Sequence, residues 1–404
     1  MLSDRQKSFW KFTFFYFLEG APIGFLWWAL PTLLKQTQWK IEDITYFTAL
    51  LAFPWTLKFL WAPLVDKQSQ KWGYRNVILL CQLGMIVGVV PVALYFHSLP
   101  FAWFGGLLVA HAICAATQDV AIDGWAMASV GENDRGRLNA AMQAGMLTAR
   151  WAFGAGLLLI PNISVNLGLC MIAGLVCSAP FVMLLLKNQR APESAEHAVG
   201  AWLWGRARNP AVLRNLGIAL LSGAGFEAIG AVAGPALLAL GYVQTEIGWF
   251  YTASVIVMIV GSWVGGVAAD KVGHARAFLR TIVALFVLCA AAGFAHSSGS
   301  SLFLVFLILV YMAIGTFTAV SYSYFMDKSA NEEYPATMFS TFMAGTNGCE
   351  AASAFLVGRL VAQWNYGTAF IVMGALSLLS CPLFKVVETS RDSMRENDHP
   401  HPGP

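Results

Sequence analysis

The chain has 404 residues, of which 57% are hydrophobic and only 12% are charged, and its formal net charge is +3. A soluble domain carries about 25% charged residues, so this composition argues against a large soluble helical protein. The small net charge gives no support for a nucleic-acid partner. The seven cysteines lie in or beside apolar runs without a C-x-x-C pair, and they predict neither a disulfide framework nor a metal site.

Apolar stretches follow one another along the whole chain. A membrane-spanning helix needs about 20 mostly apolar residues, and we expect twelve such spans at 10–34, 44–64, 76–97, 101–130, 138–160, 166–187, 212–240, 246–268, 278–296, 300–325, 339–361 and 366–387. The first stretch contains Glu19 and is not followed by a small-residue cleavage site. It is therefore interpreted as a first span and not as a cleaved signal peptide. The sequence predicts an all-α polytopic membrane protein.

The links between the spans predict the domain organisation and the orientation. The longest link, 188–211, would be a cytoplasmic linker between two six-helix bundles, 1–187 and 212–387. The tail, 388–404, is polar and rich in proline, and we expect it to be disordered. Only Lys35 and Lys40 lie in links on one side, whereas most other lysines and arginines lie in links on the opposite side. The positive-inside rule then predicts that both termini are cytoplasmic.

The two halves resemble each other as repeats. The link after the second span reads APLVDKQSQKWGYR and the link after the eighth reads GGVAADKVGHAR, so both place Asp before Lys, Gly and Arg. Two repeats of six spans with polar groups at matching depths are typical of secondary transporters. We expect these links to act as gating loops, through Asp66, Arg75, Asp270 and Arg276.

Several charges lie inside the apolar spans, where each costs about 2.5–3.5 kcal/mol on an insertion scale. Asp119 and Asp123 are four residues apart and share one helix face. Arg150 lies at a similar depth in the next span, so an Asp119–Arg150 pair is geometrically feasible. Two interpretations stay open: a permanent ion pair that fixes two helices, or carboxylates that load and release a proton.

The remaining candidates follow from depth and repeat position. Glu19 and Glu227 lie mid-span beside glycines and prolines, and alignment of the fifth and eleventh spans places Glu350 opposite Arg150. Lys58 and Arg359 lie near span ends and are assigned structural roles. We predict proton coupling by Asp119, Asp123, Glu19 and Glu227, and cargo binding by Arg150, Glu350, Tyr322, Tyr324 and Gln118. Nucleotide-binding and hydrolase motifs are absent from the sequence, so no enzyme, cofactor or metal site is expected and a proton gradient would supply the energy.

Two longer motifs carry a family resemblance. At LKFLWAPLVD (57–66) and ATQDVAIDGWA (116–126) the sequence resembles the branch of the major facilitator superfamily that contains AmpG muropeptide permeases, acetyl-coenzyme A transporters and single-component siderophore importers. The segments 18–31, 134–136 and 334–345 are also similar to this branch. The resemblance implies twelve helices in two pseudo-symmetric bundles, alternating access, and proton-driven uptake with acidic positions at Asp119 and Asp123. One departure is that Met146 and Leu147 stand where AmpG-like chains carry Tyr-Arg, and Arg150 follows one turn later.

The cargo is the least determined part of this reading. Import of a muropeptide is ranked first, a siderophore second, and acetyl-coenzyme A-type transport remains a further alternative. We expect a monomer in the bacterial inner membrane, with the lipid bilayer and a small-molecule cargo as its partners. Two other classes stay open: a receptor built on the same fold, which would have lost its cavity charges, and a membrane acyltransferase, which would need a His or Ser constellation.

Overall fold

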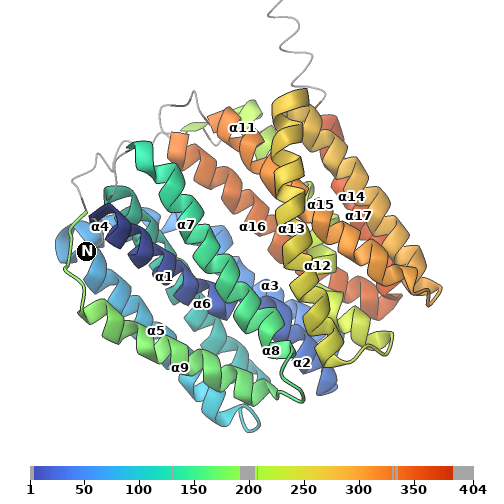
Figure 1. Cartoon of the computed structure of the whole chain (residues 1–404), viewed down its shortest axis with the longest axis horizontal. Coiled ribbons are helices and arrows are strands. Elements are labelled where there is room, and N and C mark those ends of the chain that lie inside the picture. The colour runs from blue at the N-terminus through green and yellow to red at the C-terminus, as the bar shows by residue number, and fades with distance from the viewer. Residues whose placement is uncertain are drawn as a thin grey trace, which may run out of the picture. The chain divides into compact units, whose positions relative to one another are not determined.

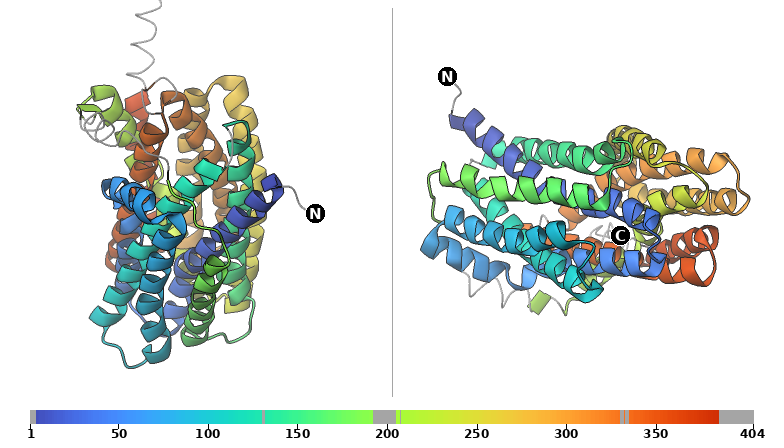
Figure 2. Two further views of the ribbon diagram at one scale, coloured as in Figure 1. Left: turned by 90° about the vertical axis from the view of Figure 1, so that its left-hand side faces the viewer. Right: turned by 90° about the horizontal axis from the view of Figure 1, so that it is seen from below.

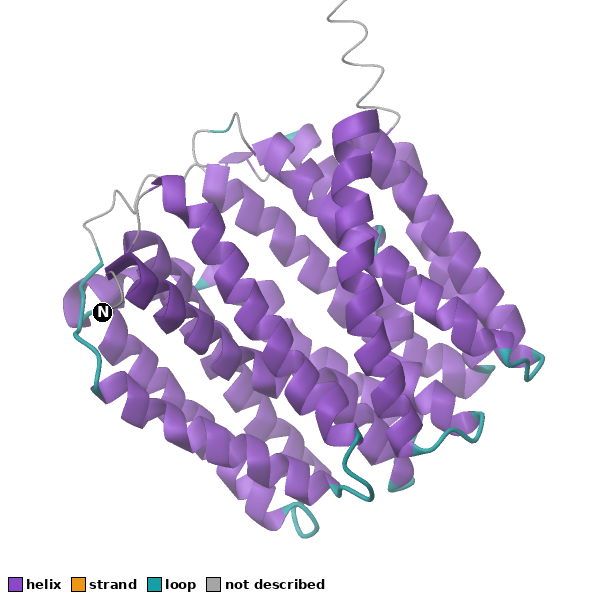
Figure 3. Ribbon diagram, in the orientation of Figure 1, coloured by secondary structure: helices purple, strands orange, loops and turns teal. Residues whose placement is uncertain are grey.

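The computed structural model describes residues 4–129, 132–191, 205–206, 208–329, 332 and 335–384. Within these ranges the chain forms helices joined by short links, and no strand occurs among the described residues (Figure 3). The predicted tail, 388–404, and most of the predicted linker, 188–211, lie outside the described residues. The all-α fold class predicted from the sequence is confirmed.

Helices occur at each of the first six predicted spans. They are α1 (Asp4–Gly24), η1 (Phe25–Ala29) and α2 (Leu30–Gln36), then α3 (Ile41–Leu57), η2 (Lys58–Leu60) and α4 (Ala62–Trp72), then α5 (Tyr74–Tyr95) and α6 (Phe101–Ser129), and finally α7 (Glu132–Arg150), η3 (Trp151–Ala155), α8 (Gly156–Leu158) and α9 (Val165–Leu184). The predicted boundaries agree with these bounds to within a few residues, apart from the first, second and fifth spans.

The second half of the chain matches its predicted spans in the same way. Its helices are α11 (Pro210–Leu221), α12 (Ala224–Ala239), α13 (Gln244–Val272), α14 (His274–Ser297), α15 (Leu302–Ser329), α16 (Pro335–Gln363), α17 (Tyr366–Ser377) and η4 (Leu378–Ser380) (Figure 1).

Most of these helices are long and apolar enough to cross a membrane. Nine helical stretches in the described part of the chain meet that criterion, and α3 with α4 adds a tenth if the bent pair counts as one span. Two of the twelve predicted spans, 138–160 and 339–361, do not meet the criterion. They correspond to α7, which carries Arg150, and α16, which carries Glu350. Both are helical, but polar side chains lower their mean hydropathy, as expected for helices that face a polar interior.

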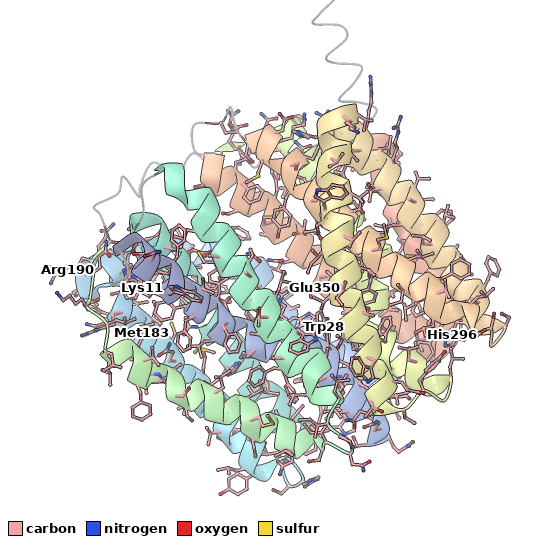
Figure 4. All side chains as sticks on the ribbon, viewed as in Figure 1. Lys11, Trp28, Met183, Arg190, His296 and Glu350 are labelled. Atoms are coloured by element: carbon pink, nitrogen blue, oxygen red, sulfur yellow. The ribbon has the colours of Figure 1, made fainter. Side chains whose placement is uncertain are left out.

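The chain divides into two compact units. Unit 1 comprises residues 1–198, 230–255 and 354–363, and unit 2 comprises residues 199–229, 256–353 and 364–404. In unit 1, α5 lies beside both α6 and α9 (Figures 1 and 2). The core at one end of this unit surrounds Trp125, which is 2% exposed and packs against Phe12, Phe15 and Tyr74. Lys11, whose ammonium lies 4.1 Å from the Trp125 ring centroid, and Met183 mark this end in Figure 4.

Unit 2 has its own aromatic core. The ring of Phe278 on α14 packs against Phe317 and Tyr324 on α15, with centroid separations of 5.1 and 5.5 Å. α14 lies against both α15 and α17. These large apolar rings fill the space between neighbouring helices, where dispersion contacts stabilise the packing.

Close backbone contact joins α1 to α7 in unit 1 (Figure 1). A Cβ atom on Gly20 would lie 2.5 Å from the carbonyl oxygen of Met146, and one on Gly24 would lie 2.5 Å from the Cα of Arg150. Each of the two helices continues into a five-residue π-helical segment: η1 follows Gly24, and η3 follows Arg150. These two segments also pack together. π-Helical turns occur frequently at functional sites.

The two repeated links adopt the same backbone conformation. Gly73 (φ +83°, ψ 152°) separates α4 from α5, and Gly273 (φ +87°, ψ 145°) separates α13 from α14. Positive φ is readily accessible only to glycine. The similarity of the two links that was predicted from the sequence therefore holds in the backbone.

The α1–α7 contact predicts opposite effects for two glycine substitutions. Gly145→Ala would place a methyl group against the backbone carbonyl of Thr13, so we expect a loss of about 1–3 kcal/mol in the free energy of unfolding. Gly174 on α9 is the matched control, because a Cβ there meets no atom within 4 Å. Gly174→Ala should be neutral or stabilising by up to about 1 kcal/mol. Thermal unfolding of both purified variants in detergent checks this, and equal stability would contradict the close contact.

Candidate functional site

α3 ends in a bend, and Lys58 lies at the start of that bend. Pro54 lies inside α3, the helix tightens to the 3-10 turn η2, and Pro63 lies in the first turn of α4. The axis changes direction by 68° between residues 60 and 62. Proline removes a helical hydrogen bond and clashes with the preceding turn, which explains the break. Lys58 begins η2 and therefore projects from the start of the bend.

Lys58 forms an ion pair with Asp119 on α6. Asp119 is 6% exposed, and its partner side chain is 27% exposed. Sequence reasoning assigned Lys58 only a structural role, whereas the structure places this lysine in the site. Asp119 pairs with Lys58 and not with Arg150, the partner considered from the sequence. Similar depth along neighbouring helices does not determine which way the side chains face.

The second carboxylate of α6 has a partner on α1. The hydroxyl of Tyr16 donates a hydrogen bond to Oδ1 of Asp123. Tyr16 was not among the predicted site residues, although a sequence signal existed, because it lies three residues before Glu19 and therefore on the same face of α1.

Glu19 completes the cluster from α1. It is 2% exposed, its carboxyl group lies within hydrogen-bonding reach of Asp119, and it interacts electrostatically with Asp123 and Lys58. Its Oε2 atom is buried without a hydrogen-bond partner in the described part of the chain. We call Tyr16, Glu19, Lys58, Asp119 and Asp123 the carboxylate cluster.

The carboxylate cluster contains three carboxyl groups and one ammonium group. Fully ionised, it would hold a net charge of −2 in a site from which water is largely excluded, and buried charges without a partner are costly. Binding of protons would reduce that cost. The arrangement is chemically suited to hold a proton among oxygens that lie close together, with Lys58 as a charge that can be shared among them.

Metal binding is a less suitable chemistry for this site. No group of three or more His, Cys, Asp or Glu residues among the described side chains is arranged to hold a metal ion. Oδ2 of Asp119 is instead directed to Lys58, and Oδ1 of Asp123 to Tyr16.

Arg150 ends α7 at the contact with Gly24 and is half-buried. Its Nε atom is buried and has no hydrogen-bond partner among the described residues. A guanidinium group offers donors in a planar fork that matches carboxylate or phosphate groups. A half-buried arginine with an unsatisfied donor is therefore suited to bind an anionic group.

The other predicted cargo residues have different environments. Gln118 is buried beside Asp119 in the sequence, and its Oε1 lacks a hydrogen-bond partner in the described part of the chain. Tyr324 is 1% exposed, and its hydroxyl donates to Oδ1 of Asn215 at 2.9 Å, as in a structural hydrogen bond. Tyr322 is exposed on the same helix. Glu227 on α12 and Glu350 on α16 are half-buried in unit 2 and engage in interactions there (Figure 4 labels Glu350).

The predicted gating residues lie at the two repeated links. The guanidinium of Arg75 donates from Nη1 to the carbonyl oxygen of Leu186 at 3.0 Å. The side chain of Asn188 lies where a Cβ on Gly73 would lie, and it donates to the carbonyl oxygen of Trp72 at 2.8 Å. Asp66 is half-buried on α4, and Arg276 is exposed on α14. Asp270 lies in α13, and its side chain is outside the described residues.

The Lys58–Asp119 pair predicts a strong non-additive effect on stability. Lys58→Met would leave a buried carboxylate without its cation, so we expect a loss of about 2–3 kcal/mol, somewhat below the ~3–5 kcal/mol of fully buried pairs because Lys58 is 27% exposed. The double variant Lys58→Met with Asp119→Asn should recover part of this loss.

Unfolding of the single and double variants in detergent measures the coupling. Lys40→Met is the control, because Lys40 is exposed and precedes α3. Additive effects of the two substitutions would show that the pair contributes nothing to stability.

Two family models match different parts of the chain. Residues 216–402 match the model described as Major Facilitator Superfamily, and residues 8–149 match the model described as Acetyl-coenzyme A transporter 1. The second range includes every residue of the carboxylate cluster.

Curated relatives include proteins named as transporters. A "Putative transporter AmpG 4" of Rickettsia conorii is 22% identical over 89% of this chain and 92% of its own length. The "Anhydromuropeptide permease" of Escherichia coli is 25% identical over 65% of this chain and 55% of its own length.

Solved structures share the fold. A nucleoside transporter, NupG, superposes with a TM-score of 0.74 at 14% identity, covering 94% of this chain and 98% of that one. A bacterial homologue of the human lysosomal transporter Spinster gives a TM-score of 0.72 at 12% identity, covering 95% and 97%. Because both matched family models, the AmpG-named relatives and the structural neighbours are transporters, this multi-pass membrane protein is similar to transporters of the major facilitator superfamily, and in sequence to AmpG-named and acetyl-coenzyme A transporters.

Proposed function

We propose that this transporter imports a polar anionic amphiphile together with protons, and that the best cargo class is a muropeptide, an anhydro-sugar linked to a peptide. The observation that carries the proposal is the carboxylate cluster of unit 1. It joins α1, η2 and α6 through three carboxyl groups, one lysine and one tyrosine within spans of the protein. Such intramembrane ionisable groups are typical of proton pathways in transporters.

The cluster supports coupling because its members can exchange partners. Glu19 lies within reach of Asp119, which in turn pairs with Lys58. A proton on Glu19 would be shared with Asp119 and would reduce the negative charge that Lys58 alone must balance. Loss of that proton would restore the negative charge that Lys58 must balance. The position of the bend that carries Lys58 would then depend on proton occupancy, which is the differential interaction that a conformational change requires.

Arg150 supports the anionic character of the cargo. Its buried Nε would gain a hydrogen-bond partner when a carboxylate or phosphate binds, and charge-assisted bonds of this kind are stronger than neutral ones. Gln118, with an unsatisfied Oε1, would provide an acceptor for a hydroxyl or amide group of the same cargo. Glu227 and Glu350 of unit 2 stay assigned to proton coupling and to cargo binding, respectively, and Tyr322 to cargo contact.

Similarity to the Escherichia coli anhydromuropeptide permease supports the muropeptide as the first cargo to test. A muropeptide carries carboxylates for Arg150 and sugar hydroxyls for neutral polar side chains. A siderophore, or an acetyl-coenzyme A-type anion suggested by the match at residues 8–149, remains the alternative. We place the protein in a bacterial inner membrane with both termini in the cytoplasm, in agreement with its lysine and arginine distribution.

Glu19→Gln should separate proton coupling from cargo transport. In proteoliposomes under an inward proton gradient, we expect wild-type protein to accumulate labelled anhydromuropeptide and Glu19→Gln to lose most of that accumulation, because the amide cannot take up and release a proton. Exchange of labelled for unlabelled cargo without a gradient should persist in the variant.

The same assay with a ferric siderophore tests the alternative cargo. Accumulation of the siderophore and not of the muropeptide would replace the proposed cargo while leaving proton coupling intact. Equal gradient-driven accumulation by wild type and Glu19→Gln would remove Glu19 from the coupling mechanism.

Substitution of Arg150 should weaken cargo binding more than it slows transport. A charge-assisted hydrogen bond contributes about 1.5–3 kcal/mol, so Arg150→Ala is expected to raise the KM for an anionic cargo by about 10- to 100-fold. Arg150→Lys, which keeps the charge but loses the planar fork, should have a smaller effect. Unchanged KM in Arg150→Ala would contradict an anchoring role.

A further inference from the structure

We propose that unit 1 contains a binding site for an anionic phospholipid, with one acyl chain in an apolar hollow beneath α4 and the phosphate beside Lys67 and Lys71. The site is separate from the carboxylate cluster and does not depend on the proposed cargo or on proton coupling.

α4 has the features of a helix that lies at the membrane surface. It follows a 68° bend after α3, so it departs from the direction of the preceding span. It is bounded by Trp61 and Trp72, and tryptophan is enriched at the membrane–water interface. Val65 and Trp72 share one face of α4, whereas Lys67 and Lys71 share the neighbouring face beside Leu64, and this combination of apolar and basic side chains suits the membrane interface.

A hollow of about 270 Å³ lies between α4, α5 and α6. Its walls are almost entirely apolar: α4 contributes Leu64 and Val65, α5 contributes Val77, Leu80 and Cys81, and α6 contributes Ile113. Leu64, Leu80 and Ile113 are exposed, so the hollow opens outward from unit 1. In a protein that spans a membrane, an open apolar hollow of this kind faces lipid chains and not a polar cargo.

The apolar surface continues beyond the hollow along α5. Leu80, Leu83 and Val87 are all exposed and follow one another at the spacing of a single helix face. An acyl chain that enters the hollow beneath α4 could therefore extend along this ridge toward the middle of the membrane. A continuous apolar path of this type suits one long hydrocarbon chain better than a small round ligand.

The charges beside the hollow determine the headgroup. Lys71 lies seven residues after Leu64, two helical turns later on nearly the same face, and Lys67 lies one turn after Leu64 on an adjacent face. Both lysines are exposed, and neither forms an ion pair with a described residue. Asp66, the acidic residue of α4, is half-buried and does not line the hollow. The lysine face of α4, which adjoins Leu64 at the wall of the hollow, is thus complementary to a phosphodiester with net negative charge.

The site adjoins the region that carries Lys58. Trp61, at the wall of the hollow, donates from Nε1 to Oγ1 of Thr117 at 3.1 Å, and Thr117 is two residues from Asp119. A lipid that fills the hollow would hold α4 against α5 and α6. Because Trp61 lies at the bend after α3, a lipid in contact with Trp61 would affect the position of that bend.

Native mass spectrometry of the full-length purified protein tests the proposal. Delipidated protein would be titrated with phosphatidylglycerol and, separately, with phosphatidylcholine of identical chains. We expect phosphatidylglycerol to bind more tightly, because a lysine near a membrane surface contributes attraction equivalent to about fivefold in affinity. Lys67→Gln with Lys71→Gln should then weaken phosphatidylglycerol binding by about 25-fold and leave phosphatidylcholine binding unchanged.

Two further variants keep the result interpretable. Ile113→Trp should fill the hollow and weaken binding of both lipids, since Ile113 is exposed and the larger ring needs no core space. Lys35→Gln with Lys40→Gln removes the same charge elsewhere and should leave phosphatidylglycerol binding as in wild type. Unfolding temperatures close to wild type would exclude misfolding as the cause of any loss.

Photo-crosslinking with a diazirine-bearing acyl chain locates the bound lipid. We expect labelled peptides from residues 61–87 and 113–117. Equal affinity for the two lipids, an unchanged affinity in the Lys67 and Lys71 double variant, or labelling confined to other helices would each overturn the proposal.

Discussion

The cost of keeping charge away from water is the constraint on which the organisation of unit 1 depends. Three carboxyl groups from α1 and α6 lie together in a protein with only 12% charged residues, and one lysine supplies the opposing charge. Lys58 reaches Asp119 because α3 ends in a 3-10 turn before a 68° bend. The lysine that balances the carboxylates therefore lies where the regular helix of α3 ends.

Close packing of α1 against α7 serves the same arrangement. Gly20, Gly24 and Gly145 let two backbones meet at distances that no other side chain would permit. This contact positions Glu19 on one side of α1 and leaves Arg150 at the junction of α7 and η3, where its Nε has no described partner. The π-helical segments η1 and η3 follow directly in both helices. In the proposed function, the anion-binding group Arg150 and the proton-holding group Glu19 are thus carried by the same pair of packed helices.

Hydropathy predicted the helices well, because a membrane span can be recognised from the length and apolar composition of its sequence. It predicted the site less completely. The depth of Asp119 and Asp123 could be estimated from residue counts, yet the partner of Asp119 depended on the local rotation introduced by Pro54, η2 and Pro63, which no count of residues reveals. Tyr16 could have been found from its spacing to Glu19. Arg150 was correctly placed inside its span, but its lack of a partner could be seen only once the side chains were placed. α7 and α16 show the limit of hydropathy itself, since the helices that carry Arg150 and Glu350 are the least apolar of the expected spans.

The central claim is that the carboxylate cluster takes up and releases a proton, and infrared difference spectroscopy tests it without knowledge of the cargo. Spectra of the reconstituted protein in acidic and alkaline buffer would be subtracted to isolate the carbonyl stretch of protonated carboxyl groups. The account predicts a band in the wild type that is lost or strongly reduced in Glu19→Gln and shifted in Asp119→Asn, because the two carboxyl groups share the proton. Identical difference spectra for the wild type and both variants would contradict the claim and leave the cluster as a structural ion pair.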